Sequence, residues 1–200
     1  MSLKLELPHS YQLEVIEELP GAGQLPQFYY GGSFFKSTPR EANERHEGLL
    51  LRVISSDKKP WIAIVKGTFD VPGSGVYSTF DPEKFCIVAG GYGYFVNAAS
   101  PQNSEGVRAM PVTDVKIIQD RSMFVFADFI KLCAYNRAGL MWESPRVCWD
   151  DLKIISINEK TIDGTGYDPT TIDTDKLMQF SVDLETGKSL LPRHPTWDNW

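Results

Sequence analysis

The densest group of side chains that could do chemistry lies in the segment WESPRVCWDD, from Trp142 to Asp151. Two tryptophans, one arginine and three carboxylates fall within ten residues there. Indole rings can stack on a sugar or a peptide, and arginine and carboxylate groups can orient it. The predicted ligand-binding residues are Trp142, Glu143, Arg146, Trp149 and Asp150. The competing interpretation is a hairpin with core tryptophans and a structural pair of arginine with a carboxylate.

The carboxylates of Glu143, Asp150 and Asp151 raise a second possibility, a hydrolase acting on a carbohydrate or peptide. Paired carboxylates cleave glycosidic bonds only at separations of about 5 to 9 Å. Adjacent Asp150 and Asp151 would point to opposite faces of a strand, which weakens this alternative. The chain also contains no nucleophile-elbow pattern. We therefore favour a non-catalytic binding or interaction protein of unknown partner, with the hydrolase as the alternative.

A second group of acidic residues begins in the sequence DGTGYD (163–168) and continues after it. Oxygen ligands close to glycine turns suit calcium, so the candidate ligands are Asp163, Asp168, Asp173 and Asp175. Their order differs from the twelve-residue loop that binds calcium between two helices, and an exposed acidic loop is the competing interpretation. The three histidines do not form metal-binding spacings with one another or with the cysteines. No cofactor is predicted.

The pentapeptide ETGKS, at 185–189, ends like a phosphate-binding loop. Such a loop needs a glycine five residues before the glycine of GKS, and this chain has Val182 there. Two prolines soon after Ser189 prevent a regular helix. We therefore interpret 183–188 as a strand end and a turn, in which Gly187 supplies a positive φ.

The composition is that of an ordinary soluble globular protein, with 42% hydrophobic and 23% charged residues. A net charge of −6 without basic runs argues against nucleic acid or an anionic membrane as a partner. Cys86, Cys133 and Cys148 each lie in an apolar run, which predicts buried, reduced thiols in a cytoplasmic protein. Residues 1–8 show no targeting signal. No run of apolar residues approaches the length of about 20 residues that a membrane-spanning helix needs.

The elements that would hold these groups are strands. The strand-like runs are 49–54, 61–69, 85–96, 112–118, 123–135, 147–157 and 177–184. A bulge or a close backbone approach is expected at Gly90–Gly93, inside one run. Only 37–48 starts like a helix, with Thr38 before Pro39, but it has no apolar face. Many short strands separated by turns predict an all-β antiparallel protein with few or no helices.

A faint internal repeat places an apolar strand end before Asn97, Asn136 and Asp183, at intervals of 39 and 47 residues. Glycines follow the last two, at Gly139 and Gly187. Such spacing is typical of four-stranded propeller blades. The runs IKLCAYNRAGLMW (130–142) and VDLETGK (182–188) resemble the blade turn of quinoprotein-like β-propellers, in which a strand ends in Asp or Asn, turns at glycine and returns through a tryptophan-containing strand.

The resemblance implies a β fold built of repeated sheets and covers a minority of the chain. A closed propeller usually needs more blades than 200 residues hold, so we expect a two-sheet sandwich or an incomplete propeller-like array. Residues 1–191 are expected to form a single domain, and 192–200 a C-terminal tail. Trp197 and Trp200 in this tail are expected to dock on the domain or on a second copy, which would make the protein a homodimer.

Overall fold

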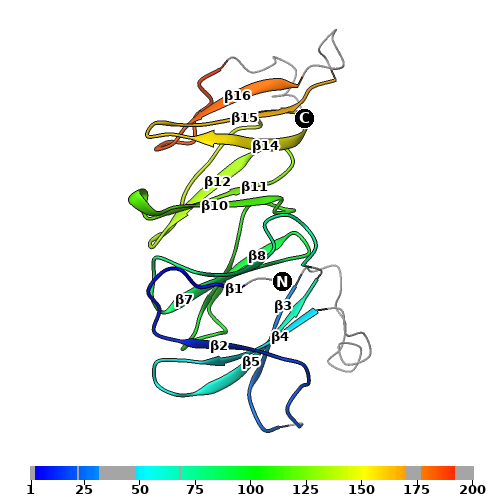
Figure 1. Ribbon diagram of the computed structural model, residues 1–200, viewed down its shortest axis with the longest axis vertical. Helices are drawn as coiled ribbons and strands as arrows, with labels where there is room; N and C mark the ends of the chain where they lie inside the picture. The colour runs from blue at the N-terminus through cyan, green and yellow to red at the C-terminus, as the bar shows by residue number, and fades with distance from the viewer. Residues whose placement is uncertain (1–2, 22, 32–47, 68, 170–176, 192–200) are drawn as a thin grey trace. The chain divides into compact units, whose positions relative to one another are not determined.

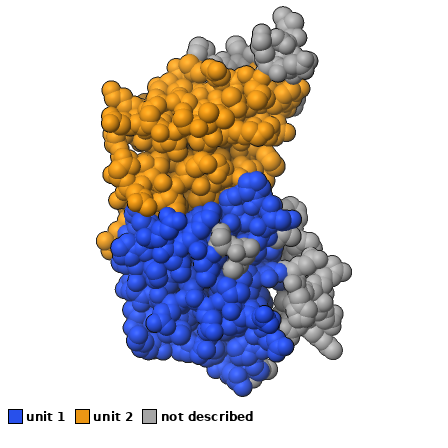
Figure 2. Space-filling model, in the orientation of Figure 1, with its two compact units in different colours: residues 1–107 blue, residues 108–200 orange. Residues whose placement is uncertain are grey.

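The computed structural model describes residues 3–21, 23–31, 48–67, 69–169 and 177–191. It divides into two compact units, 1–107 and 108–200 (Figure 2). Each unit has its own hydrophobic core. That 1–191 form one domain stays a prediction. The described residues contain 16 strands, one short 3-10 helix and no α-helix. The predicted all-β, mostly antiparallel fold is therefore confirmed, and none of the four sheets closes into a barrel.

The first unit contains nine strands in two sheets (Figure 1). Sheet 1 has the strand order β2-β4-β5-β3, and sheet 2 has the order β1-β6-β7-β8-β9. Their bounds are β1 Leu3–Lys4, β2 Gln12–Ile16, β3 Gln27–Tyr30, β4 Gly48–Ile54, β5 Pro60–Lys66, β6 Gly75–Ser78, β7 Lys84–Ala89, β8 Tyr92–Asn97 and β9 Ser104–Gly106. Two pairings are parallel: β3 with β5, and β1 with β6, where Leu3 lies opposite Val76. All other pairings in the unit are antiparallel.

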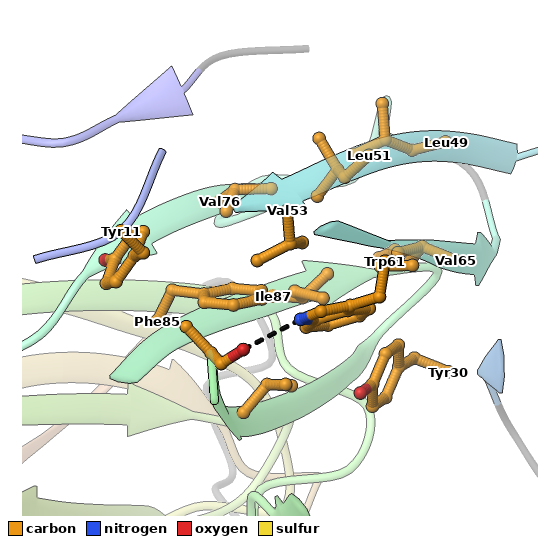
Figure 3. Close-up of a cluster of buried hydrophobic side chains, with 14 residues drawn as sticks. Tyr11, Tyr30, Leu49, Leu51, Val53, Trp61, Val65, Val76, Phe85 and Ile87 are labelled. Carbon is orange, nitrogen blue, oxygen red and sulfur yellow. Dashed lines mark hydrogen bonds between the residues drawn. The ribbon is translucent and has the colours of Figure 1, made fainter. Parts of the chain in front are cut away.

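The core of the first unit lies between sheets 1 and 2 (Figure 3). Leu49, Leu51 and Val53 reach it from alternate positions of β4, as the period-two pattern of a half-buried strand requires. At its centre, the Trp61 indole Nε1 donates a hydrogen bond of 2.7 Å to the carbonyl oxygen of Ala98. The polar edge of a buried tryptophan is thereby satisfied inside an apolar core.

The second unit also consists of two sheets (Figure 1). Sheet 3 is a meander of β10 Asp114–Ile118, β11 Met123–Ala127, β12 Leu132–Asn136 and β13 Gly139–Glu143, with the 3-10 helix η1 Gln119–Arg121 between β10 and β11. Sheet 4 contains β14 Asp150–Ile157, β15 Thr161–Tyr167 and β16 Met178–Asp183. The core between them is built of Val125, Leu132 and Trp142 from sheet 3 and of Ile162 and Phe180 from sheet 4.

Strand β15 corrects the expectation of an acidic loop at DGTGYD. Gly164 and Gly166 occupy its buried positions, next to Ile162. A Cβ at Gly164 would lie 2.4 Å from Cζ of Phe180, and a Cβ at Gly166 would lie 2.3 Å from Cβ of Cys148. These two glycines are therefore required by close packing inside the sheet pair.

Two of the predicted runs, 85–96 and 123–135, are hairpins and not single strands. In the first, Gly90 and Gly91 have φ values of 55° and 81°, and Ala89 pairs with Tyr92. Two consecutive positive φ angles are the geometry of a tight hairpin turn, so the expected bulge is corrected to a turn. In the second, the four residues from Asp128 to Lys131 separate β11 from β12.

The predicted turn positions are confirmed. Asn97, Asn136 and Asp183 each end a strand, and each side chain accepts at least one backbone N–H group, at 2.8 to 2.9 Å, from the turn that follows. Gly139 and Gly187 have φ values of 114° and 70°. The GKS sequence therefore belongs to a turn. That these positions form a propeller-like repeat stays a prediction, and the predicted helix start at 37–48 lies outside the described residues except for Gly48, which begins β4.

Candidate functional site

Trp142, a predicted ligand-binding residue, lies in the core. Only 7% of its surface is exposed, and its Nε1 donates a hydrogen bond of 3.0 Å to the carbonyl oxygen of Leu184. A Cβ at Gly187 would lie 2.5 Å from Cε3 of the indole. Trp142 therefore joins sheet 3 to the turn after β16, and its ring faces protein atoms.

Arg146 and Trp149 lie together on the linker that joins β13 to β14. The guanidinium carbon of Arg146 lies 4.5 Å from the centre of the Trp149 ring. Nε and Nη2 of Arg146 each donate a hydrogen bond of 3.0 Å, to the carbonyl oxygens of Cys148 and Trp149. Both side chains are half-exposed. The arginine thus fixes the linker and keeps one face of the indole covered, a cation–π arrangement.

The three predicted carboxylates all have partners within the chain. Glu143 forms an ion pair with Lys131, and Asp151 forms one of 2.8 Å with Lys153. Asp150 accepts the backbone N–H of Asp151 at 2.7 Å. Asp151 has φ = 52°, at a β-bulge that interrupts the pairing of β14 with β15. At the start of β14, Asp150 and Asp151 are therefore held by partners within two residues of them in the sequence.

The turn between β11 and β12 also belongs to this region, and sequence analysis missed it. Its Phe129 is 49% exposed, and the Phe129 carbonyl oxygen accepts hydrogen bonds from the Leu152 N–H at 3.2 Å and from the Cys148 thiol at 3.4 Å. These contacts place the turn beside the linker and the start of β14. We call Phe129, Arg146, Trp149 and Asp150 the linker surface.

Asp128 begins the same turn and is 4% exposed. Burial raises the pKa of its carboxyl above the ordinary value of 3.8, and the nearby Glu143 carboxylate adds to the effect. Hydrogen bonds from the N–H groups of Ile130 and Lys131 and the charge of Lys131 lower the pKa but do not cancel the effect of burial. A neutral carboxylic acid is therefore easier to form here than in water.

The three cysteines are buried and unpaired, which confirms the prediction of buried free thiols. Burial raises the pKa of Cys133 and of Cys148 to about 12, with the Asp150 carboxylate adding to the effect at Cys148. Burial also raises the pKa of Cys86. Because the thiolate is the nucleophile, these groups are poorly suited to covalent catalysis at neutral pH.

The predicted calcium ligands are not gathered in the described part of the chain. Both carboxylate oxygens of Asp163 are occupied, by the hydroxyls of Thr161 at 2.7 Å and Ser181 at 2.6 Å and by the Asn158 amide at 3.2 Å. Asp168 is buried just after β15. Asp173 and Asp175 lie outside the described residues. Among the residues that the structure describes, no group of three or more His, Cys, Asp or Glu side chains could hold a metal ion.

The chain matches no protein-family model and no curated protein. Within the described ranges, no helix is both long and apolar enough to cross a membrane.

Proposed function

We propose that this protein is a non-catalytic binding or interaction protein and that the linker surface is its contact site. The observation that carries the proposal is the exposed Phe129, on a turn whose backbone is hydrogen-bonded to Cys148 and Leu152, at either end of the stretch that carries Trp149 of the stacked pair Arg146 and Trp149. Aromatic and arginine side chains are the residues that contribute most to binding energy at protein interfaces. Loops fixed on a β scaffold are a common place for such sites.

The partner is a protein or a small ligand, and the net charge of −6 disfavours nucleic acid and anionic membranes. We further propose a cytoplasmic location, supported by three buried thiols that form no disulfide.

A homodimer through Trp197 and Trp200, and a propeller-like repeat, are part of the same proposal. Light scattering of the full chain and of a chain that ends at Leu191 tests the dimer: a monomeric full chain would contradict it.

The alternative, a hydrolase that uses Glu143, Asp150 and Asp151, has less support. Two of these carboxylates are ion-paired with lysines, and the third accepts a backbone N–H group. A panel of glycoside and peptide substrates tests it directly. Hydrolysis that disappears in both Glu143→Gln and Asp150→Asn would replace the binding proposal with this one.

Affinity capture with quantitative mass spectrometry tests the linker surface. We expect partners captured by the wild type to be depleted about tenfold or more by the double substitution Phe129→Ser and Trp149→Ser, as for the loss of interface hot spots. Val15→Ser is the matched control, because Val15 is a similarly exposed apolar residue (45%) on β2 in the first unit. Equal depletion by both variants, or by neither, would contradict the proposed site.

A further inference from the structure

Strand β14 forms one edge of sheet 4, with β15 between it and β16 (Figure 1). The edge at β16 is covered by residues 188–190, where the Leu190 N–H donates to the Ser181 carbonyl oxygen at 2.8 Å. The edge at β14 is covered only at its start, where the Leu152 N–H donates to the Phe129 carbonyl oxygen at 3.2 Å. In the described part of the chain, no strand pairs with the rest of that edge.

The backbone groups that the open edge presents are those of Ile154 and Ile157. Along a strand, the N–H and C=O groups of successive residues point alternately to one side and to the other. The Leu152 N–H points away from β15, whereas the Asn158 N–H donates to the first residue of β15 at 3.0 Å. By this alternation Ile154 and Ile157 both face outward, since Ile155 between them is the extra residue of a β-bulge. The outward groups are therefore three residues apart.

This spacing decides which strand can pair with the open edge. The outward groups of a regular antiparallel strand are two residues apart, so a regular strand is out of register with one of the two positions. Bulges protect edge strands from unwanted pairing in this way. A second copy of β14 carries the same bulge, and in the antiparallel direction it places its Ile157 opposite Ile154 and its Ile154 opposite Ile157. The strand that matches this edge is therefore β14 itself.

The side chains agree with this register. It sets Asp151, whose carboxylate also pairs with Lys153 in its own chain, opposite Lys160 of the second copy. Lys153 lies opposite the neutral Asn158, so no two like charges face each other, and opposite charges across a strand pair are stabilising. Ile155 would meet its counterpart near the two-fold axis. It is 69% exposed, the most exposed large apolar side chain in the described ranges, and the pairing would bury it.

We propose that the open edge of β14 is an interaction surface for a second copy of this chain. Antiparallel pairing of Ile154 with Ile157 would join two three-stranded copies of sheet 4 into one continuous sheet. Main-chain hydrogen bonds give such strand addition its affinity. The pairing uses neither the linker surface nor Trp197 and Trp200, so it goes beyond the proposed function.

Light scattering after size exclusion, over a range of concentrations of the full chain, tests the pairing. Ile155→Lys should raise the dissociation constant of the dimer about tenfold or more, because two lysines would then meet near the axis. Met141→Lys is the matched control, since Met141 is a 40% exposed apolar residue on β13, and it should leave the constant unchanged. A monomeric wild type would overturn the proposal, as would equal constants for the two variants. A chain that ends at Leu191 should remain a dimer, and a monomer there would assign the dimer to the tail instead.

Amide hydrogen exchange followed by NMR tests the register in the full chain. The N–H groups of Ile154 and Ile157 should be protected in the wild-type dimer and should exchange about tenfold faster or more in monomeric Ile155→Lys. The Leu152 N–H, which is bonded within its own chain, should exchange equally in both. Fast exchange at Ile154 and Ile157 in the wild-type dimer would overturn edge pairing. Equal protection of the two amides in the monomer would overturn it as well, since the chain itself would then cover this edge.

Discussion

The indole of Trp142 fills the space that a side chain at Gly187 would need, with Cε3 only 2.5 Å from the position of a Cβ. Gly187 also has φ = 70°, a conformation that side chains disfavour. We therefore predict that Gly187→Ala lowers the free energy of unfolding by about 2 to 4 kcal/mol, from backbone strain and overpacking together. Urea unfolding measures the loss.

Two other glycines separate the causes of that loss. Gly23 has φ = 84° in open space, so Gly23→Ala should cost about 1 to 2 kcal/mol from the backbone alone. Gly106 has open space and no such φ, and Gly106→Ala should change stability by less than about 0.5 kcal/mol. A Gly187→Ala loss no larger than that of Gly23→Ala would show that the indole moves away without cost.

Asp183 should titrate below its ordinary pKa of 3.8, because the Thr186 hydroxyl and N–H donate to its carboxylate at 2.6 and 2.8 Å. Its contribution to stability is present above pH 3.8 and is lost as the pH falls through the lowered folded pKa. We predict that Thr186→Ala raises the Asp183 pKa toward 3.8, as measured by carboxyl NMR titration. Thr161→Ala removes a donor to Asp163 and should leave the Asp183 pKa unchanged.

Gly166 and Cys148 should be coupled in stability. Gly166→Ala alone is predicted to cost about 1 to 3 kcal/mol, because its Cβ would lie 2.3 Å from Cβ and 2.6 Å from Sγ of Cys148. Cys148→Gly removes both atoms, so the double variant should be more stable than the sum of the single effects by about 1 to 3 kcal/mol. As a control, the stability changes of Gly106→Ala and Cys148→Gly should simply add in the double variant. If the changes of Gly166→Ala and Cys148→Gly also simply add, the predicted contact between these two residues is excluded.

The native thiols should be almost inert. A rise in pKa from 9.0 to about 12 at Cys133 and Cys148 lowers the thiolate fraction about a thousandfold at pH 8. Ellman's reagent should therefore detect none of the three thiols in the folded protein and all three in guanidinium chloride. Fast reaction of one native thiol, identified by mass spectrometry, would show that its sheet pair opens.

The sequence predicts strands best where apolar residues alternate, as they do from Met178 to Leu184. It fails at β15, where glycines occupy two of the three buried positions, Gly164 and Gly166. Only Ile162 gives an apolar signal there. It fails also at Asp128, because a single Asp followed by Phe-Ile in a long, mostly apolar run gives a weak turn signal. The all-β class survives such local errors, because class depends on many short runs together.

The candidate site could be predicted only in part. The chemistry of WESPRVCWDD was visible, but Trp142 is buried by contacts with Leu184 and Gly187, which are far away in the sequence. Phe129 was not recognised because its exposure depends on a turn that the apolar pattern conceals. In both cases tertiary contacts, which no local pattern encodes, decide whether an aromatic ring faces solvent.

The parallel pairing of Leu3 and Lys4 with Val76 and Tyr77 sets an order of events during synthesis. Sheets 3 and 4 are each built from consecutive strands, so each can assemble as its segment leaves the ribosome. Sheet 2 cannot be completed in this way, because its first strand is made about 70 residues before its partner and must wait while sheet 1 is translated. Leu3 and Lys4 can therefore take their place only after all of sheet 1 has been made and Val76 and Tyr77 have followed.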